Sequence, residues 1–191
     1  MGAIEPFPKT KLIMGVLSTL PEKKEELRHI LVEEFGPIDY ESQEFDFTFT
    51  DYYVPEMGSG IKRFFYSFVN LVSPDQLPDI KIRTNELEER FAADGNRKIN
   101  LDPGLLSLSS LILATTKNNV HRIPLQKGIY GEVTLMYVNK EYQTLPWTYS
   151  DYRTRAFHDI FKEHGFDWGG DWVRDGYQLY KDYQHFAKEI K

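Results

Sequence analysis

The sequence predicts an α+β fold, with a ferredoxin-like antiparallel sheet core, extra strands and a C-terminal helical extension. Three observations support this class. A strand-then-helix unit spans residues 12–36, phenylalanines alternate with polar residues from Phe45 to Phe49, and a second helix-then-strand unit runs from Pro74 to Leu101. Together these segments give the order βαββαβ. An antiparallel sheet with two helices on one face satisfies that order.

The first unit begins with the apolar run Leu12–Leu17, which is typical of a strand covered on both faces. Thr19 and Glu22 have the spacing of a capping box, and Pro21 favours the start of a helix. Gly36 and Pro37 then end that helix. Its inward residues recur at helical spacing: Leu27, Ile30, Leu31 and Phe35.

The second segment alternates strictly, so we predict a half-buried strand over Phe45–Thr50. Continuing the alternation places Asp51 and Tyr53 on the phenylalanine face. Residues 54–60 predict a turn or mobile loop. Residues 62–72, rich in Phe, Tyr and Val, predict the returning strand.

A second helical region opens at Pro74, and we expect Pro78 to split it. The inward stripe of its later part is Ile80, Thr84, Leu87 and Phe91. A strand from Arg97 to Leu101 follows.

The segment Leu105–Thr116 is ambiguous, because residues 106–109 fit a strand whereas Leu105, Leu108 and Ile112 fit a helix. We predict a helix, with Asp102 as N-cap and Pro103 at the first position. Two further strands are expected over residues 121–125 and 129–138. We therefore expect an α+β domain over residues 1–150 and a helical extension over residues 151–191 packed on it.

Composition limits the function. The net charge of −6 argues against non-specific binding to DNA, which needs a basic face. The absence of cysteine excludes thiolate nucleophiles and zinc–thiolate sites. No apolar run is long enough to span a membrane, and the N-terminus lacks the features of a signal peptide, so we expect a cytoplasmic protein. The oligomeric state stays open.

Polar groups suited to a ligand gather between Arg97 and Tyr137, inside an otherwise apolar run. The predicted partner is an anionic or phosphorylated small molecule, such as a nucleotide with Mg²⁺. The predicted ligand-binding residues are Asn100, Asp102, Lys117, His121, Arg122, Lys127 and Tyr130. The alternatives are that Asp102 only caps a helix and that the basic residues are solvated charges at strand ends.

Asp51 is the candidate catalytic base, with Glu56 as a second acid beside the glycine-containing loop. The alternative is a structural carboxylate paired with a nearby tyrosine or with Arg63. Glu132 and Thr134 share a strand face that either lines a pocket or faces water.

Many ordered motifs resemble the family called domain of unknown function 4416, over about residues 10–153. They include Phe35-Gly-Pro-Ile-Asp39, Pro55-Glu-Met-Gly58, Asn100-Leu-Asp-Pro-Gly104, Leu113-Ala-Thr-Thr-Lys117, Lys127-Gly-Ile-Tyr130 and Leu145-Pro-Trp-Thr-Tyr149. The family has no established activity. The resemblance implies GTP as a candidate ligand, since some members are described as GTP-binding, although this chain has no Gly-x-x-x-x-Gly-Lys-Ser/Thr loop.

The tail, residues 157–187, resembles the C-terminal end of zinc D-Ala-D-Ala carboxypeptidases and endolysin peptidases. That resemblance implies His185 as a zinc ligand and Asp182 as the catalytic base, but the upstream ligand segment is missing. The alternative is a packing stripe formed by Leu179, Tyr183, Phe186 and Ile190. A third hypothesis is a non-catalytic interaction module whose contact surface is the aromatic-rich region 142–172.

Overall fold

The computed structural model describes residues 2–166, in which the strands form a single nine-stranded sheet. The strands are β1 Thr10–Ser18, β2 Ile38–Glu41, β3 Phe45–Asp46, β4 Lys62–Val72, β5 Ile99–Leu106, β6 Ser110–Thr115, β7 Ile123–Pro124, β8 Tyr130–Val138 and β9 Glu141–Thr144. The α-helices are α1 Lys24–Phe35, α2 Val54–Met57, α3 Leu77–Arg90 and α4 Arg155–Phe166. Short 3-10 helices are η1 Pro21–Lys23, η2 Pro74–Gln76 and η3 Asp151–Arg153.

The sheet has the order β2-β4-β1-β5-β6-β8-β7, and its named pairs are antiparallel. Strands β1, β2, β4 and β5 are joined through α1 and α3 in the predicted order βαββαβ, although β2 takes the place predicted for the strand at residues 45–50. The α+β class with an antiparallel sheet is therefore confirmed. No helix in the described part of the chain has both the length and the apolar character needed to cross a membrane.

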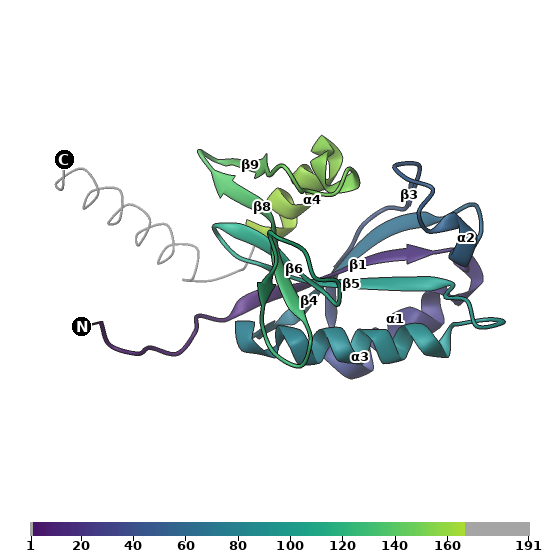
Figure 1. The fold of residues 1–191 in the computed structure, drawn as a ribbon, viewed down its shortest axis with the longest axis horizontal. Helices are drawn as coiled ribbons and strands as arrows, with labels where there is room; N and C mark the ends of the chain where they lie inside the picture. The colour runs from purple at the N-terminus through teal and green to yellow at the C-terminus, as the bar shows by residue number, and fades with distance from the viewer. Residues whose placement is uncertain (1, 167–191) are drawn as a thin grey trace.

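Helices α1 and α3 cover one face of the sheet (Figure 1). Leu27 and Leu31 of α1 and Leu87 of α3 are buried there against alternate residues of β1 such as Met14 and Val16. The inward stripe predicted for the second helix is buried, as expected. This layer is the largest of the four apolar clusters of the described residues, and it packs the sheet against its two crossover helices.

The opposite face carries a second apolar cluster, which α4 helps to close. Phe157 and Phe161 of α4 pack edge-on against Phe65 of β4, with ring centroids 4.8 and 5.2 Å apart. Ile13 of β1 and Leu135 of β8 belong to the same cluster. The beginning of the predicted extension thus contributes core residues to this face.

The helix predicted after Asp102 is wrong. Residues 99–106 form β5, which pairs along its whole length with residues 11–18 of β1, and residues 110–115 turn back as β6. The turn is closed locally, since the Ser107 amide donates to the Ser110 carbonyl at 2.9 Å and the Ser110 amide donates to the Ser107 hydroxyl at 3.1 Å. Pairing along a whole neighbouring strand outweighs the local helix signals of Asp102 and Pro103.

Four smaller expectations also change. The strand predicted over residues 45–50 pairs only at β3, and the predicted loop at 54–60 contains the single-turn helix α2. Pro78 does not split the second helix, because it lies in the first turn of α3, where a missing amide costs nothing. Thr19 does not cap α1, whose start is the 3-10 turn at Pro21.

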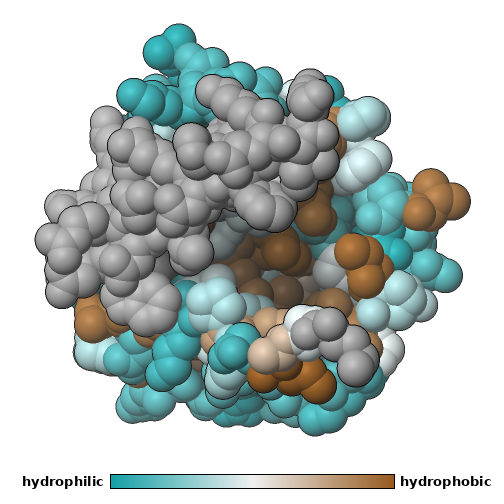
Figure 2. Space-filling model, turned by 90° about the vertical axis from the view of Figure 1, so that its left-hand side faces the viewer, coloured by the Kyte–Doolittle hydropathy of each residue, from teal (hydrophilic) through white to brown (hydrophobic). Residues whose placement is uncertain are grey.

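From the side where the N-terminal segment begins, apolar residues gather in a hollow near the centre of the view (Figure 2). The most exposed apolar side chains of the described residues, Ile4 and Val120, belong to irregular segments. Single exposed apolar residues of this kind are normal on a protein surface.

Replacing Phe157 with alanine tests the packing of α4. The side chain is 1% exposed and contacts Phe45 and Phe65, so we expect a loss of about 3–5 kcal/mol in the free energy of unfolding, measured by urea denaturation. The matched control is Lys162→Ala on the exposed side of the same helix, expected to change stability by less than about 0.5 kcal/mol. Equal stability of F157A and K162A would contradict the packing of α4 described above.

Candidate functional site

A buried arginine lies at the centre of the sheet face that α4 partly covers. Arg63 occupies β4 in phase with Phe65, and its side chain is 2% exposed. Its Nη1 donates to Asp102 Oδ2 at 3.1 Å, and its Nη2 lies 3.2 Å from Asp151 Oδ2. The guanidinium also lies 5.0 Å from the ring centroids of Phe65 and Tyr152. We call Asp102, Arg63 and Asp151 the acceptor floor, because its two carboxylates, which share one buried cation, are hydrogen-bond acceptors.

Gly15 of β1 makes room for this arrangement. A Cβ atom at Gly15 would lie 2.8 Å from the Tyr152 hydroxyl and 3.2 Å from Arg63 Nη2. Both groups therefore lie directly over the backbone of β1, in space that any larger residue would occupy. The Tyr152 hydroxyl and Arg63 Nε are fully buried and make no hydrogen bond within the described residues.

A polar chain leads from the acceptor floor to the helices. Asn100 donates to Asp102 Oδ1 at 3.0 Å and accepts from Arg97 at 2.9 Å. Arg97 pairs with both oxygens of Glu56 on α2, at 2.7 and 2.8 Å, and with Glu88 on α3 at 3.0 Å. Arg97 thus fixes the orientation of Asn100 and holds α2 against the sheet.

The two carboxylates of the floor differ in their pKa. Burial alone would raise the pKa of Asp102, but Arg63, Lys81 and the hydrogen bond from Asn100 hold it below its usual range. Burial raises the pKa of Asp151, and Arg63 offsets this only in part. The lowered pKa keeps Asp102 ionised, and hence a hydrogen-bond acceptor, at neutral pH.

A second cluster surrounds Glu132 of β8, which is 1% exposed. Its Oε2 interacts with His121 Nε2 at 2.9 Å and accepts from Arg122 Nε at 2.8 Å. Its buried Oε1 has no donor within the described residues. The His121 ring stacks on Trp147 with centroids 4.9 Å apart, and Arg122 Nη2 donates to the Tyr149 hydroxyl at 2.8 Å.

Tyr149 connects the two clusters electrostatically. Burial raises the pKa of Tyr149 to about 12, and the negative charge of Glu132 adds to the rise. Arg122 lowers this pKa, whereas Asp102 and Asp151 raise it further. Burial likewise raises the pKa of Tyr53, which Asp102 raises further and Arg63 lowers. Both tyrosine hydroxyls thus stay protonated beside the acceptor floor.

Lys117 completes the polar surface. Its Nζ donates to the Tyr52 hydroxyl at 2.7 Å and lies 4.4 Å from the centroid of that ring. Its carbonyl accepts from Arg122 Nη1 at 2.8 Å. We call Lys117 and Arg122 the donor rim, because both present cationic N–H groups from the segment between β6 and β7.

Some of the residues predicted as a site are gathered here and others are not. Asn100 and Asp102 lie in one cluster, and Lys117, His121 and Arg122 lie in or beside the other. Lys127 instead pairs with Asp79 of α3 at 2.6 Å, on exposed surface. Tyr130 is half-buried in β8, where it pairs with Thr115 and Pro124.

Asp51 is exposed in the turn before α2, and its carbonyl accepts the amide of Val54 at 3.0 Å. The partner that we considered for Asp51, Arg63, is held by Asp102 and Asp151 instead. Glu132 does not face water, since its side chain is buried. The ligand roles of all these residues stay predictions.

The sequence reasoning missed Arg63, Asp151 and Tyr149 as site residues. The signal for Arg63 was available, because it alternates with Phe65 and Ser67 on a strand that returns to the core. A charged residue in phase with a core face has a buried partner. Tyr149 lies just before the 3-10 helix η3, and Asp151 is its first residue. A helix of three residues is too short for a periodic pattern, so nothing in the sequence specifies the direction of these side chains.

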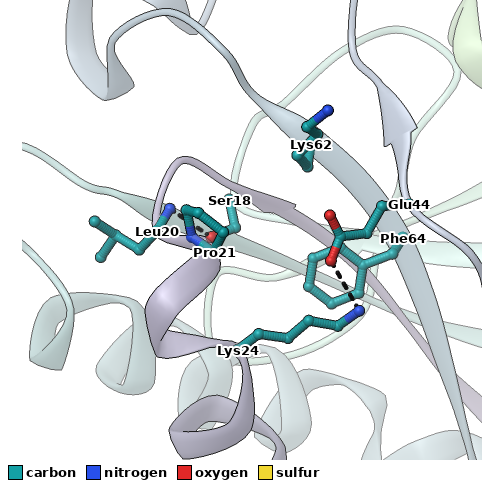
Figure 3. Close-up of a pocket in the computed structure, with 7 residues that line it drawn as sticks. All are labelled: Ser18, Leu20, Pro21, Lys24, Glu44, Lys62 and Phe64. Carbon is teal, nitrogen blue, oxygen red and sulfur yellow. Dashed lines mark hydrogen bonds and ion pairs between the residues drawn. The ribbon is translucent and has the colours of Figure 1, made fainter.

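A small pocket lies elsewhere, between β1, α1 and β4 (Figure 3). It is lined by Ser18, Leu20, Pro21, Lys24, Glu44, Lys62 and Phe64. Its volume of about 10 Å³ is close to what a single water molecule requires, and the Lys24 Nζ–Glu44 Oε1 pair at 2.9 Å crosses it. This pocket does not suit an organic ligand.

The peptidase hypothesis depends on Asp182 and His185, which lie outside the described residues. Within residues 2–166, no three His, Asp or Glu side chains come close enough to hold a metal ion. The proposed contact region 142–172 is described only as far as Phe166. Both alternatives stay predictions, and zinc analysis of the full chain tests the first.

Comparison with known proteins gives one match. The model of the family described as "Domain of unknown function (DUF4416)" matches residues 8–165. No curated protein and no solved structure matches the chain. The match confirms the resemblance found from the motifs and assigns no activity.

Replacing Arg63 with methionine tests the acceptor floor. The variant leaves two carboxylates buried without their cation, so we expect a loss of about 3–5 kcal/mol in unfolding free energy at pH 7. Without Arg63, the pKa of both carboxyls should rise, and protonation should then stabilise the variant as the pH falls. Wild-type Asp102, whose pKa is lowered, contributes stability above its unfolded pKa and loses it as the pH falls.

The difference in stability between wild type and R63M should therefore shrink between pH 7 and pH 4.5, measured by urea denaturation at each pH. Lys9→Met is the control, because Lys9 is exposed before β1 and makes no ion pair within the described residues, so no pH-dependent difference is expected. A constant difference for R63M would mean that Asp102 and Asp151 do not depend on Arg63.

Proposed function

The chain belongs to the family described as domain of unknown function DUF4416, and from its site we propose that it binds a phosphorylated small molecule at the donor rim. Nucleotides such as GTP, with the Mg²⁺ that accompanies them, fall in this class. The observation that carries the proposal is the hydrogen bond from Arg122 to the Lys117 carbonyl, which joins two cationic residues of one segment beside the buried carboxylate of Glu132.

The charge balance of the rim supports an anion of low charge. Glu132 neutralises Arg122, whereas the described partners of Lys117 are the hydroxyl and ring of Tyr52, which are neutral. One net positive charge thus rests on the rim. A single phosphate group matches this better than an extended polyanion, which Glu132 and the floor carboxylates would repel.

The donors of the rim also have capacity for a ligand. Arg122 uses three N–H groups on Glu132, the Lys117 carbonyl and Tyr149, whereas a guanidinium has about five. Its side chain is only 8% exposed, so hydrogen bonds to a phosphate there would be poorly screened by water. Glu132 and Tyr149 keep the guanidinium fixed, which reduces the entropy cost of binding.

Titration calorimetry tests this proposal with inorganic phosphate, ribose 5-phosphate, GMP, and GTP with and without Mg²⁺. We expect binding of at least one phosphorylated compound, and Arg122→Gln and Lys117→Ala should each weaken it about 10- to 100-fold, as loss of a charge-assisted hydrogen bond does.

Lys127→Ala is the matched control, since Lys127 pairs with Asp79 and lies in neither cluster. It also tests the role predicted for Lys127 from the sequence. Absence of heat and of any thermal shift with the whole panel would exclude the proposal. Equal weakening by K127A and K117A would place the site elsewhere.

A further inference from the structure

We infer that the acceptor floor binds hydroxyl groups of the same ligand, which makes the ligand class a sugar phosphate, free or within a nucleotide. This inference rests on the proposed phosphate site and adds the second half of the ligand. The juxtaposition that carries it is that of the donor rim and the acceptor floor at Tyr149, whose hydroxyl accepts from Arg122 at 2.8 Å and whose ring centroid lies 6.3 Å from that of Tyr152.

Asp102 has acceptor capacity to spare. Each of its oxygens has one described donor, Asn100 on Oδ1 and Arg63 on Oδ2. A carboxylate accepts about four hydrogen bonds. The side chain is 26% exposed, whereas its cation Arg63 is 2% exposed beneath it. The unused lone pairs of Asp102 are thus the part of the floor that a ligand reaches.

The charge of the floor selects a neutral group. A ligand anion would face Asp102 and Asp151, and a ligand cation would compete with Arg63 for carboxylates that the protein already needs to stabilise that buried charge. A hydroxyl group adds no charge and gains a charge-assisted hydrogen bond to a carboxylate. Hydroxyls therefore fit this floor better than amines or acids do.

A donor is present beside these acceptors. The Tyr152 hydroxyl is 1% exposed, lies over Gly15 next to Arg63, and makes no hydrogen bond within the described residues. Because a hydroxyl group both donates and accepts, it can satisfy Asp102 and Tyr152 together. A buried hydroxyl without a hydrogen-bond partner lowers the stability of the protein, so the Tyr152 hydroxyl favours a ligand with a polar group at this point.

The floor is also held rigid. Arg97 fixes Asn100, and the rings of Phe65 and Tyr152 fix Arg63. Tyr149 is 41% exposed and offers an aromatic face beside the floor, which suits the C–H face of a sugar ring. Ordered acceptors next to an aromatic ring distinguish a sugar from a bare phosphate.

The test compares ribose 5-phosphate, glucose 6-phosphate and GMP with their 2-deoxy analogues by titration calorimetry on the full chain. We expect the hydroxylated form of the preferred compound to bind about 10- to 100-fold more tightly than its deoxy analogue. Asp102→Asn should reduce this preference to less than about threefold while dependence on the phosphate persists.

Tyr152→Phe keeps the ring that packs on Arg63 and removes only the hydroxyl, so it tests the floor if D102N does not fold. It should also reduce the preference. Asp159→Asn on exposed α4 surface is the control and should keep it. Arg122→Gln should weaken the two sugar forms equally, because it acts on the phosphate.

The outcomes separate the two proposals. Equal binding of hydroxylated and deoxy phosphates, with K117A and R122Q still weakening both, overturns the inference and leaves the phosphate site standing. Unphosphorylated ribose binding as tightly as ribose 5-phosphate overturns the proposed function but supports the floor. No binding of any sugar phosphate overturns the inference, and GMP binding without ribose 5-phosphate binding assigns the site to nucleotides.

Discussion

The burial of Arg63 is the constraint on which the rest of this face depends. Removing a guanidinium from water costs several kcal/mol unless carboxylates and hydrogen bonds replace the lost hydration. The two carboxylates come from β5 and from η3, which are almost fifty residues apart in sequence. Arg63 therefore ties the chain after β9 to the centre of the sheet, and α4 follows directly from that attachment.

Gly15 and Tyr152 show how little space surrounds the Arg63 guanidinium. Because Gly15 has no Cβ, the guanidinium can lie close to the backbone of β1, 5.0 Å from the ring centroids of both Phe65 and Tyr152. The difference in pKa between Asp102 and Asp151 has a physical cause. Both carboxylates contact Arg63, but Asp102 also accepts a hydrogen bond from Asn100 and is attracted by the charge of Lys81. The pKa of the more accessible carboxyl, Asp102, is thus lowered, whereas the pKa of the more buried one, Asp151, is raised.

The periodic elements were predictable, and the hairpin was not. Residues 24–35 and 77–90 repeat apolar residues at helical spacing, and burial of that stripe is enough to define a helix. Asp102 and Pro103 favour the start of a helix, but the segment that contains them, β5, pairs with β1 along the whole length of β5. The polar residues from Asn100 to Arg122 were still placed near one another, because β5, β6 and β8 are sheet neighbours. Their partners Asp151 and Tyr149 depend on the long-range path of the chain, which no local pattern encodes.

Lys117 connects the site to the segment before α2. Its ammonium now donates to Tyr52 from an exposed position, where such a contact contributes little to stability. A phosphate at the donor rim would therefore draw Lys117 away from Tyr52 at small cost. Arg97, in contrast, holds Glu56 through two hydrogen bonds from a half-buried position, so α2 itself would stay in place. Any response to a ligand would then be confined to residues 47–53, which carry Tyr53 beside the acceptor floor and are bounded on one side by this fixed helix.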